Sequence, residues 1–221
     1  MDLAAAVAPT TLARQRTLPV ADPLQPLLPE GGLARGRTIA CRGPAATSLA
    51  IALTVEATAA GAWLAIVDVP WLGIEAVAEL GVPLERLVRV EAADALSWAD
   101  LVAAVLDGFE LVVTRVPRRV NAGVLRRVQS RIQTREAVLL VVGDPGPLTA
   151  DVAMEASFPV WEGVDEGAGH LRGRRVTVVA SGRRIPRPRR ADLWLPGPGG
   201  VVAVVDPAVD PVAEPVLRSV G

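Results

Sequence analysis

Short, mostly apolar runs alternate with helical segments through the first two thirds of the chain. The apolar runs predict buried strands at 38–41, 63–67, 87–90, 111–114 and 138–142. Between them, apolar residues recur at helical spacing and predict helices over about 45–60, 73–80, 97–107 and 121–134. Continuous apolar strands separated by helices are typical of a parallel sheet with helices on both faces.

The pattern changes after residue 147. Three further strands are predicted at 152–161, 175–180 and 191–195, separated only by turns and charged loops. This indicates antiparallel strands added to one edge of the parallel sheet. We divide the chain into an N-terminal arm (1–30), a core domain (31–196) and a C-terminal tail (197–221), because prolines interrupt both ends. We expect the arm to pack on the body or on a partner, and 201–205 is a candidate strand within the tail.

Composition narrows the classes of function. The chain is 51% hydrophobic and 21% charged, which indicates a globular body. Its net charge of −1 gives no bulk attraction to a polyanion, so a nucleic-acid surface would have to be local. One cysteine and one histidine exclude an internal disulfide and a Cys- or His-rich metal site. We interpret His170 as a turn residue.

The most apolar stretch, residues 44–67, has Glu56 in its middle and is divided by Gly61. A charge at the centre of a bilayer is costly, so this stretch predicts a buried helix and a buried strand, with no membrane span. Together with the single cysteine, it leads us to expect a cytoplasmic protein.

Residues 31–53 have the strand–loop–helix order in which P-loop proteins hold a phosphate. A working P-loop needs a second glycine and a lysine. After Gly43 the chain continues with Pro44, Ala45, Ala46, Thr47 and Ser48, and the sequence contains no lysine at all. We therefore expect no nucleotide cofactor and interpret Gly43, Thr47 and Ser48 as a degenerate remnant. In that interpretation Thr47 and Ser48 cap the following helix, and the alternative is residual anion binding.

Several segments resemble the RecA recombinase family. Residues 31–37 resemble the turn that enters its first core strand, and Gly43-Pro44 resembles the opening of its Walker A loop. Residues 79–87 resemble its K-L-G-V-D-x-x-x-L segment, and 171–179 with 187–195 resemble its final hairpin. The resemblance covers about 20–196. It implies a RecA-like, three-layer α/β fold with a mostly parallel central sheet and antiparallel strands at its C-terminal edge.

The departures from the RecA pattern fall on the catalytic positions. RecA-like ATPases place a water-activating glutamate after the second core strand, where this chain has Asp68. Their Walker B strand ends in a magnesium-binding aspartate, whereas here Thr114 is followed by Arg115, which would repel the cation. The segments that correspond to the two DNA-binding loops are short: about six residues join Thr114 to Asn121, and the second loop is cut to 143–151. We therefore expect no enzyme activity, no catalytic residues and no metal.

Among RecA-like proteins the chain resembles the ImuA-type mutagenesis accessory proteins, especially their shortened actinobacterial form. That resemblance implies a non-catalytic adaptor in an inducible (SOS) translesion-synthesis mutasome of DNA damage tolerance. Its implied partners are a Y-family-polymerase-like adaptor (ImuB-like) and, through it, an error-prone polymerase. The alternatives are a SulA-like cell-division inhibitor and a divergent ATP-binding recombinase paralogue.

Candidate contact residues are one tryptophan and a set of arginines. Trp71, beside Pro70, is expected on a loop at the carboxyl edge of the sheet. The arginines are either a solvated surface or a docking surface for an acidic partner or for DNA backbone. They are Arg115, Arg118, Arg119, Arg126, Arg127, Arg131, Arg135, Arg183, Arg184, Arg187, Arg189 and Arg190. No aromatic residue separates the last five, which excludes a base-stacking platform, and the acidic stretch 162–166 is their alternative partner.

Overall fold

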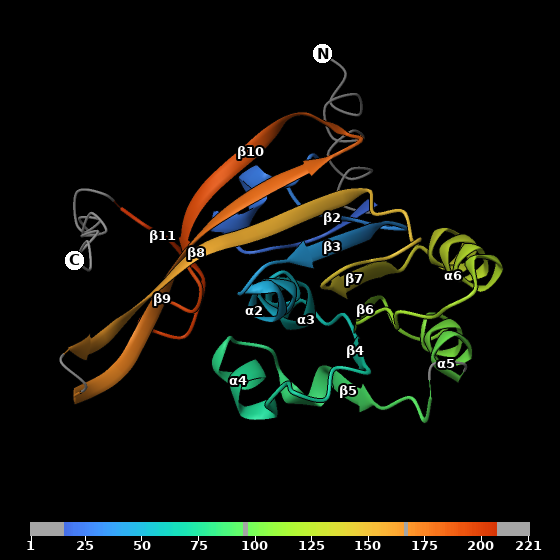
Figure 1. Cartoon of the computed structure of the whole chain (residues 1–221), viewed down its shortest axis with the longest axis horizontal. Helices are drawn as coiled ribbons and strands as arrows, with labels where there is room; N and C mark the ends of the chain where they lie inside the picture. The colour runs from blue at the N-terminus through green and yellow to red at the C-terminus, as the bar shows by residue number, and fades with distance from the viewer. Residues whose placement is uncertain (1–15, 95–96, 166–167, 207–221) are drawn as a thin grey trace, which may run out of the picture.

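The computed structural model describes residues 16–94, 97–165 and 168–206, and within them a nine-stranded sheet has the order β11-β10-β9-β8-β3-β7-β6-β4-β5 (Figure 1). The strands from β8 to β5 are parallel. They are β8 (Val152–Asp165), β3 (Thr38–Arg42), β7 (Val138–Val142), β6 (Leu111–Thr114), β4 (Leu64–Val67) and β5 (Leu87–Val90). β9 (Ala168–Gly182), β10 (Ile185–Trp194) and β11 (Ala203–Val204) follow as antiparallel strands. The predicted mixed α/β architecture is confirmed.

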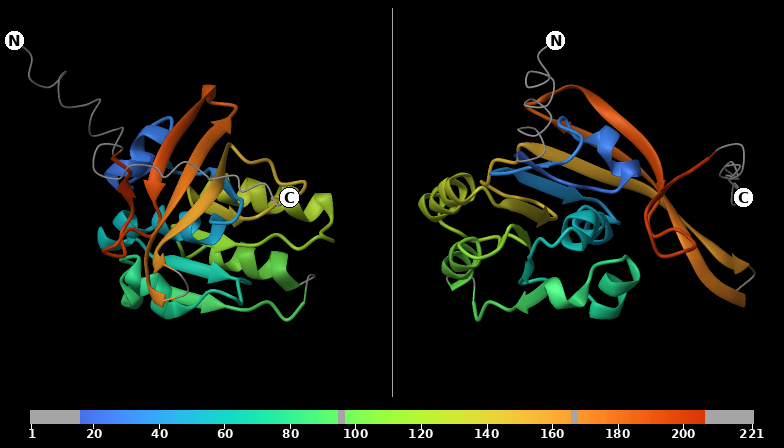
Figure 2. Two further views of the ribbon diagram at one scale, coloured as in Figure 1. Left: turned by 60° about the vertical axis from the view of Figure 1, so that its left-hand side comes forward. Right: turned by 180° about the vertical axis from the view of Figure 1, so that it is seen from behind.

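Helices cover both faces of the parallel part, which makes three layers (Figures 1 and 2). One face carries α2 (Ala46–Ala52), α3 (Val55–Ala59), α4 (Ile74–Glu79) and the 3₁₀ helix η1 (Asp22–Leu27). The other carries α5 (Ser97–Val105) and α6 (Ala122–Arg135), and a short 3₁₀ turn, η2 (Leu84–Arg86), leads into β5. Along β4, Leu64 and Ile66 join the first core while Ala65 and Val67 join the second, as the alternation of a strand requires.

The helix predicted over 45–60 is two helices. Thr54 lies between them, and its backbone N–H and its hydroxyl both donate to the Ile51 carbonyl, at 2.8 and 2.7 Å. Such local hydroxyl bonds compete with a continuous helix. The break lets α2 and α3 bury separate apolar faces against the sheet.

Residues 16–30 are attached to the core. β1 (Thr17–Leu18) pairs with β2 (Leu33–Ala34), and η1 places fully buried Leu24 and Leu27 in the first core. Arg189 of β10 donates to the Pro26 and Leu28 carbonyls, at 3.1 and 2.6 Å. At the other end, β11 lies within the segment predicted as a tail and pairs with β10, so the sheet extends past residue 196. Residues 1–15 of the predicted N-terminal arm and 207–221 of the predicted C-terminal tail lie outside the described residues.

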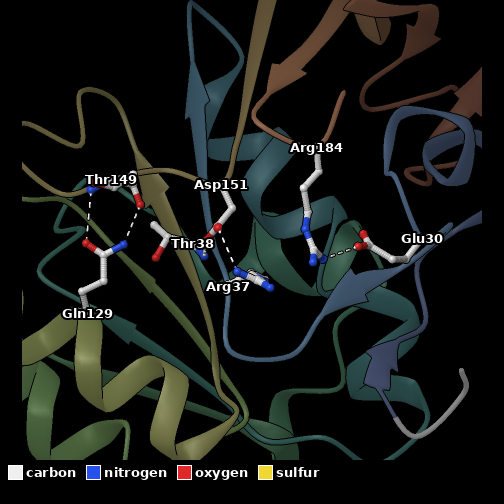
Figure 3. A network of polar contacts seen from close by, with 7 residues as sticks. All are labelled: Glu30, Arg37, Thr38, Gln129, Thr149, Asp151 and Arg184. Atoms are coloured by element: carbon white, nitrogen blue, oxygen red, sulfur yellow. Dashed lines mark hydrogen bonds and ion pairs between the residues drawn. The ribbon is translucent and has the colours of Figure 1, made fainter. Parts of the chain in front are cut away.

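A polar network closes the amino edge of the sheet, where β3 and β8 begin (Figure 3). The Asp151 carboxylate accepts from the Thr38 backbone N–H at 3.0 Å and from the Arg37 guanidinium at 3.2 Å. Gln129 of α6 bonds to Thr149, and Arg184 pairs with Glu30 at 2.9 Å. The short segment 143–151 therefore runs back across the sheet and is held at its far end.

The second half of β8 projects past the parallel sheet. β8 pairs with β3 only from Val152 to Glu155 and then continues with β9 as a two-stranded ribbon. We call residues 156–165 and 168–174 the arm of the sheet; it extends to one side of the molecule in Figure 1 and in the right-hand view of Figure 2. Among the described residues, no helix has the length and apolar character needed to cross a bilayer.

Candidate functional site

The carboxyl edge of the parallel strands is where ligands bind in open α/β sheets. The loop after β3 is the segment that would hold a phosphate, and it consists of Gly43, Pro44 and Ala45 alone. Gly43 has a φ of +85°, and a Cβ atom on it would lie 2.0 Å from the Ala156 carbonyl oxygen. The Ala46 N–H donates to the Gly43 carbonyl at 3.1 Å. A P-loop has four residues between its two glycines, so this turn is too short to surround a phosphate.

The two hydroxyl residues of the remnant have partners within the protein. Thr47 and Ser48 lie inside α2, whose N-cap is Ala45 with no side-chain cap bond, so the prediction that they cap the helix is wrong. The Thr47 hydroxyl accepts from the Trp71 indole N–H at 3.2 Å. The Ser48 hydroxyl accepts from the Arg174 guanidinium at 2.8 Å. The fold therefore uses both side chains to attach neighbouring elements to α2.

Arg174 of β9 was not among the predicted residues. It is only 8% exposed, donates to the Leu195 carbonyl at 2.8 Å and lies 4.9 Å above the Trp161 ring centre. Burial lowers the pKa of the Arg174 guanidinium. Arginine nevertheless stays protonated in proteins, so a fixed positive charge lies behind the first turn of α2. No sequence pattern signals this role, because the residues that Arg174 contacts come from distant segments.

Asp68 and Arg115 face each other across the carboxyl edge. Asp68 follows β4 with a φ of +54°, and its N–H donates to the Val90 carbonyl at 3.0 Å. Arg115 follows β6; its guanidinium lies 3.9 Å from the Asp68 carboxylate and 5.3 Å above the Trp71 ring centre. Trp71 lies on the segment between β4 and α4 and is 53% exposed. Within the described residues, no group of three His, Cys, Asp or Glu side chains is placed to hold a metal ion.

The structure does not bring the predicted arginines together. On α6, Arg131 and Arg135 both pair with Asp107, whose pKa these two guanidinium groups lower to about 2. The others on or just before α6 are exposed: Arg118, Arg119, Arg126 and Arg127. Arg115 lies beside Trp71 at the carboxyl edge.

The arginines of the β9–β10 hairpin lie at the opposite edge of the sheet. Arg184 and Arg189 hold residues 26–30, and Arg190 pairs with Asp192 at 3.1 Å. Exposed Arg183 and Arg187 complete this group. Glu162 pairs with Arg175 of β9, so the prediction that the acidic stretch faces the hairpin is wrong for this residue. Glu166 lies outside the described residues.

Two single residues complete the predicted set. His170 lies in β9, so its interpretation as a turn residue is wrong. Cys41 is fully buried in β3, and burial raises the pKa of its thiol to about 12.

Comparisons with known proteins bear on the fold and the family of the chain. The chain is similar to the crystal structure of the RadB recombinase with a TM-score of 0.58 and 15% identity, over 80% of this chain and 94% of that one. At that identity the likeness shows the fold alone. The uncharacterized protein Rv3395c of Mycobacterium tuberculosis is 32% identical over 145 residues, which cover 62% of this chain and 71% of that protein. The model of the MT3502 N-terminal domain matches residues 26–147, more than half of the chain. The chain therefore belongs to the MT3502 N-terminal domain family, with a RecA/RadB-like fold.

Proposed function

We propose that the protein is a non-catalytic, RecA-fold accessory protein that acts by binding other proteins. One observation carries the proposal: a three-residue turn takes the place of the P-loop, and the Thr47 and Ser48 hydroxyl groups that follow it are bonded to Trp71 and Arg174. A triphosphate needs free backbone N–H groups, a lysine and a metal-binding carboxylate there. The chain has no lysine, and Asp68 lies against Arg115.

We further propose that its partners belong to a translesion-synthesis mutasome. The support is the resemblance to the ImuA-type accessory proteins together with the RecA-like fold and the short segments at 115–121 and 143–151. In this proposal the protein binds an ImuB-like adaptor and, through it, an error-prone polymerase. DNA contact, where it occurs, is limited to backbone phosphates near Arg118, Arg119 and Arg127, which are exposed.

Co-purification of the full chain with the ImuB-like adaptor tests this proposal. We expect a stable complex without nucleotide, unchanged when ATP and Mg²⁺ are added. An absent complex would refute the mutasome role. A complex that forms only with ATP would favour the divergent recombinase paralogue. Binding to a cell-division protein in place of the adaptor would favour the SulA-like alternative.

A further inference from the structure

The arm exposes three large apolar side chains, two of which, Trp161 and Leu171, line the same groove. Phe158, Trp161 and Leu171 are 80%, 46% and 58% exposed. Scattered apolar residues are normal on a surface, whereas a cluster rimmed by polar residues marks an interaction site. Phe158 has a φ of +51°, which is rare for a bulky residue, and it lies at a bulge between Ser157 and Val160. The strained bulge holds an aromatic side chain in solvent, and such strain points to a function.

One edge of the arm has no partner strand in the described part of the chain. Beyond Glu155, β8 pairs with β9 alone, because β3 ends at Arg42 and turns away at Gly43. The unpaired edge of β8 therefore lies on the side of the strand where β3 pairs with its first residues, beyond the end of β3. An open edge of this kind is a template for another strand.

The backbone of Trp161 faces this open edge. Trp161 lies opposite Arg174, whose N–H donates to the Pro196 carbonyl and whose carbonyl accepts from the Leu195 N–H, at 2.8 and 2.7 Å. Both backbone groups of Arg174 thus point away from β8. Residues that lie opposite each other in an antiparallel pair either exchange both backbone hydrogen bonds or exchange none. The N–H and carbonyl of Trp161 therefore point away from β9, toward the open edge.

Positive charge lies on the face of the arm that carries the Trp161 side chain. A groove of about 700 Å³ lies between the arm, α4 and the segment 196–200. Trp161, Leu171, Arg172 and Arg174 line it on the arm side, and its acidic residue, Glu79, lies on the α4 side. Arg172 is exposed and has no ion pair among the described residues, and the side chain of Arg174 is fixed over Trp161. The arm side of the groove is therefore apolar and cationic, which is complementary to an apolar segment with an acidic side chain.

We propose that the open edge of β8 binds an extended segment of a partner protein, which adds as a strand beside Trp161 and places a carboxylate against Arg172. Strand addition takes affinity from main-chain hydrogen bonds and specificity from alternate side chains. A second copy of this chain fits less well, since a symmetric contact at Trp161 would bring Arg172 of both copies to the same edge. This inference rests on the proposed adaptor role and names the surface that performs it.

Selection from a random dodecapeptide library displayed on phage tests the proposal, with the full chain as bait. We expect enriched peptides to alternate apolar residues and to contain at least one Asp or Glu. A synthetic copy of an enriched peptide should slow hydrogen exchange of the Trp161 amide. Arg172→Glu should weaken its binding at least about tenfold and Trp161→Ala should abolish it. Arg187→Glu is the matched control, because Arg187 is exposed at the opposite edge of the sheet, and it should leave binding unchanged.

Three results would overturn the inference. The first is a selection that enriches no peptide, and the second is enriched peptides that bind Arg172→Glu as well as the unaltered chain. The third is a dimer of the protein alone, detected by sedimentation, that is lost in Trp161→Ala. Such a dimer would show that the open edge binds a second copy of this chain. Equal unfolding midpoints of the variants would show that they fold. Adaptor binding is measured separately: if it persists in Trp161→Ala and Arg172→Glu, this inference fails while the proposed function stands.

Discussion

Replacement of Arg174 by alanine should destabilise the protein markedly. Its guanidinium joins three parts of the fold by bonds to Ser48 and the Leu195 carbonyl and by its contact with Trp161. A hydrogen bond from a charged group contributes about 1.5–3 kcal/mol and a cation–π contact about 0.5–2 kcal/mol. Arg174 is only 8% exposed, so its charge carries a desolvation cost in the folded protein. The alanine variant is relieved of this cost, which offsets part of the loss. We expect a net loss of about 2 kcal/mol in the free energy of unfolding, or about 4–8 °C in the melting temperature.

Urea denaturation followed by tryptophan fluorescence measures this loss. Arg172→Ala is the matched control: it removes an exposed arginine two residues away and should change stability by less than about 0.5 kcal/mol. A double-mutant cycle with Ser48→Ala should give a coupling energy of about 1 kcal/mol for the bond between the two side chains. Arg174→Ala within about 0.5 kcal/mol of the unaltered chain, or strict additivity with Ser48→Ala, would refute the reasoning.

Three further predictions concern single residues. Gly43→Ala should lower the free energy of unfolding by about 2–5 kcal/mol, because it adds a Cβ 2.0 Å from the Ala156 oxygen at a φ of +85°. Gly108→Ala is the control, because a Cβ there would have no atom within 4 Å. Equal unfolding midpoints of the two variants would contradict the close approach at Gly43. The lowered pKa of Asp107, about 2 against an ordinary 3.8, means that its contribution to stability is present above about pH 4 and is lost as the pH falls toward 2. Asp107→Asn should flatten the melting temperature over that window, and an unchanged slope would contradict this. Cys41 should not react with Ellman's reagent at pH 8 until the protein is unfolded, because burial raises its thiol pKa to about 12; rapid reaction of the folded protein would show that the strand opens.

Much of the fold was predictable because its strands are nearly continuous apolar runs. β5, β6 and β7 begin and end where the sequence predicts. The break at Thr54 was not predicted, because apolar spacing does not register a hydroxyl that bonds back to the Ile51 carbonyl. The length of β8 and β9 was also missed. The missed residues, 162–165 and 168–174, pair only with each other and carry little of the apolar signal of a buried strand.

The candidate site was predictable in what it lacks but not in what replaces it. The missing lysine and second glycine are visible in the sequence. The partners of Thr47 and Ser48 are not, since Trp71 and Arg174 are separated from them by 24 and 126 positions. Likewise, the spacing of Arg131 and Arg135 indicates a shared helix face. Only the fold shows that Asp107 pairs with both.

Isothermal titration calorimetry of the full chain with ATP and Mg²⁺, repeated with ADP, tests the central claim most directly. The account predicts no saturable heat at millimolar nucleotide, because the Gly43 turn is closed and Thr47 and Ser48 are bonded to Trp71 and Arg174. Saturable binding that Gly43→Ala or Ser48→Ala abolishes, in variants that remain folded, would contradict it.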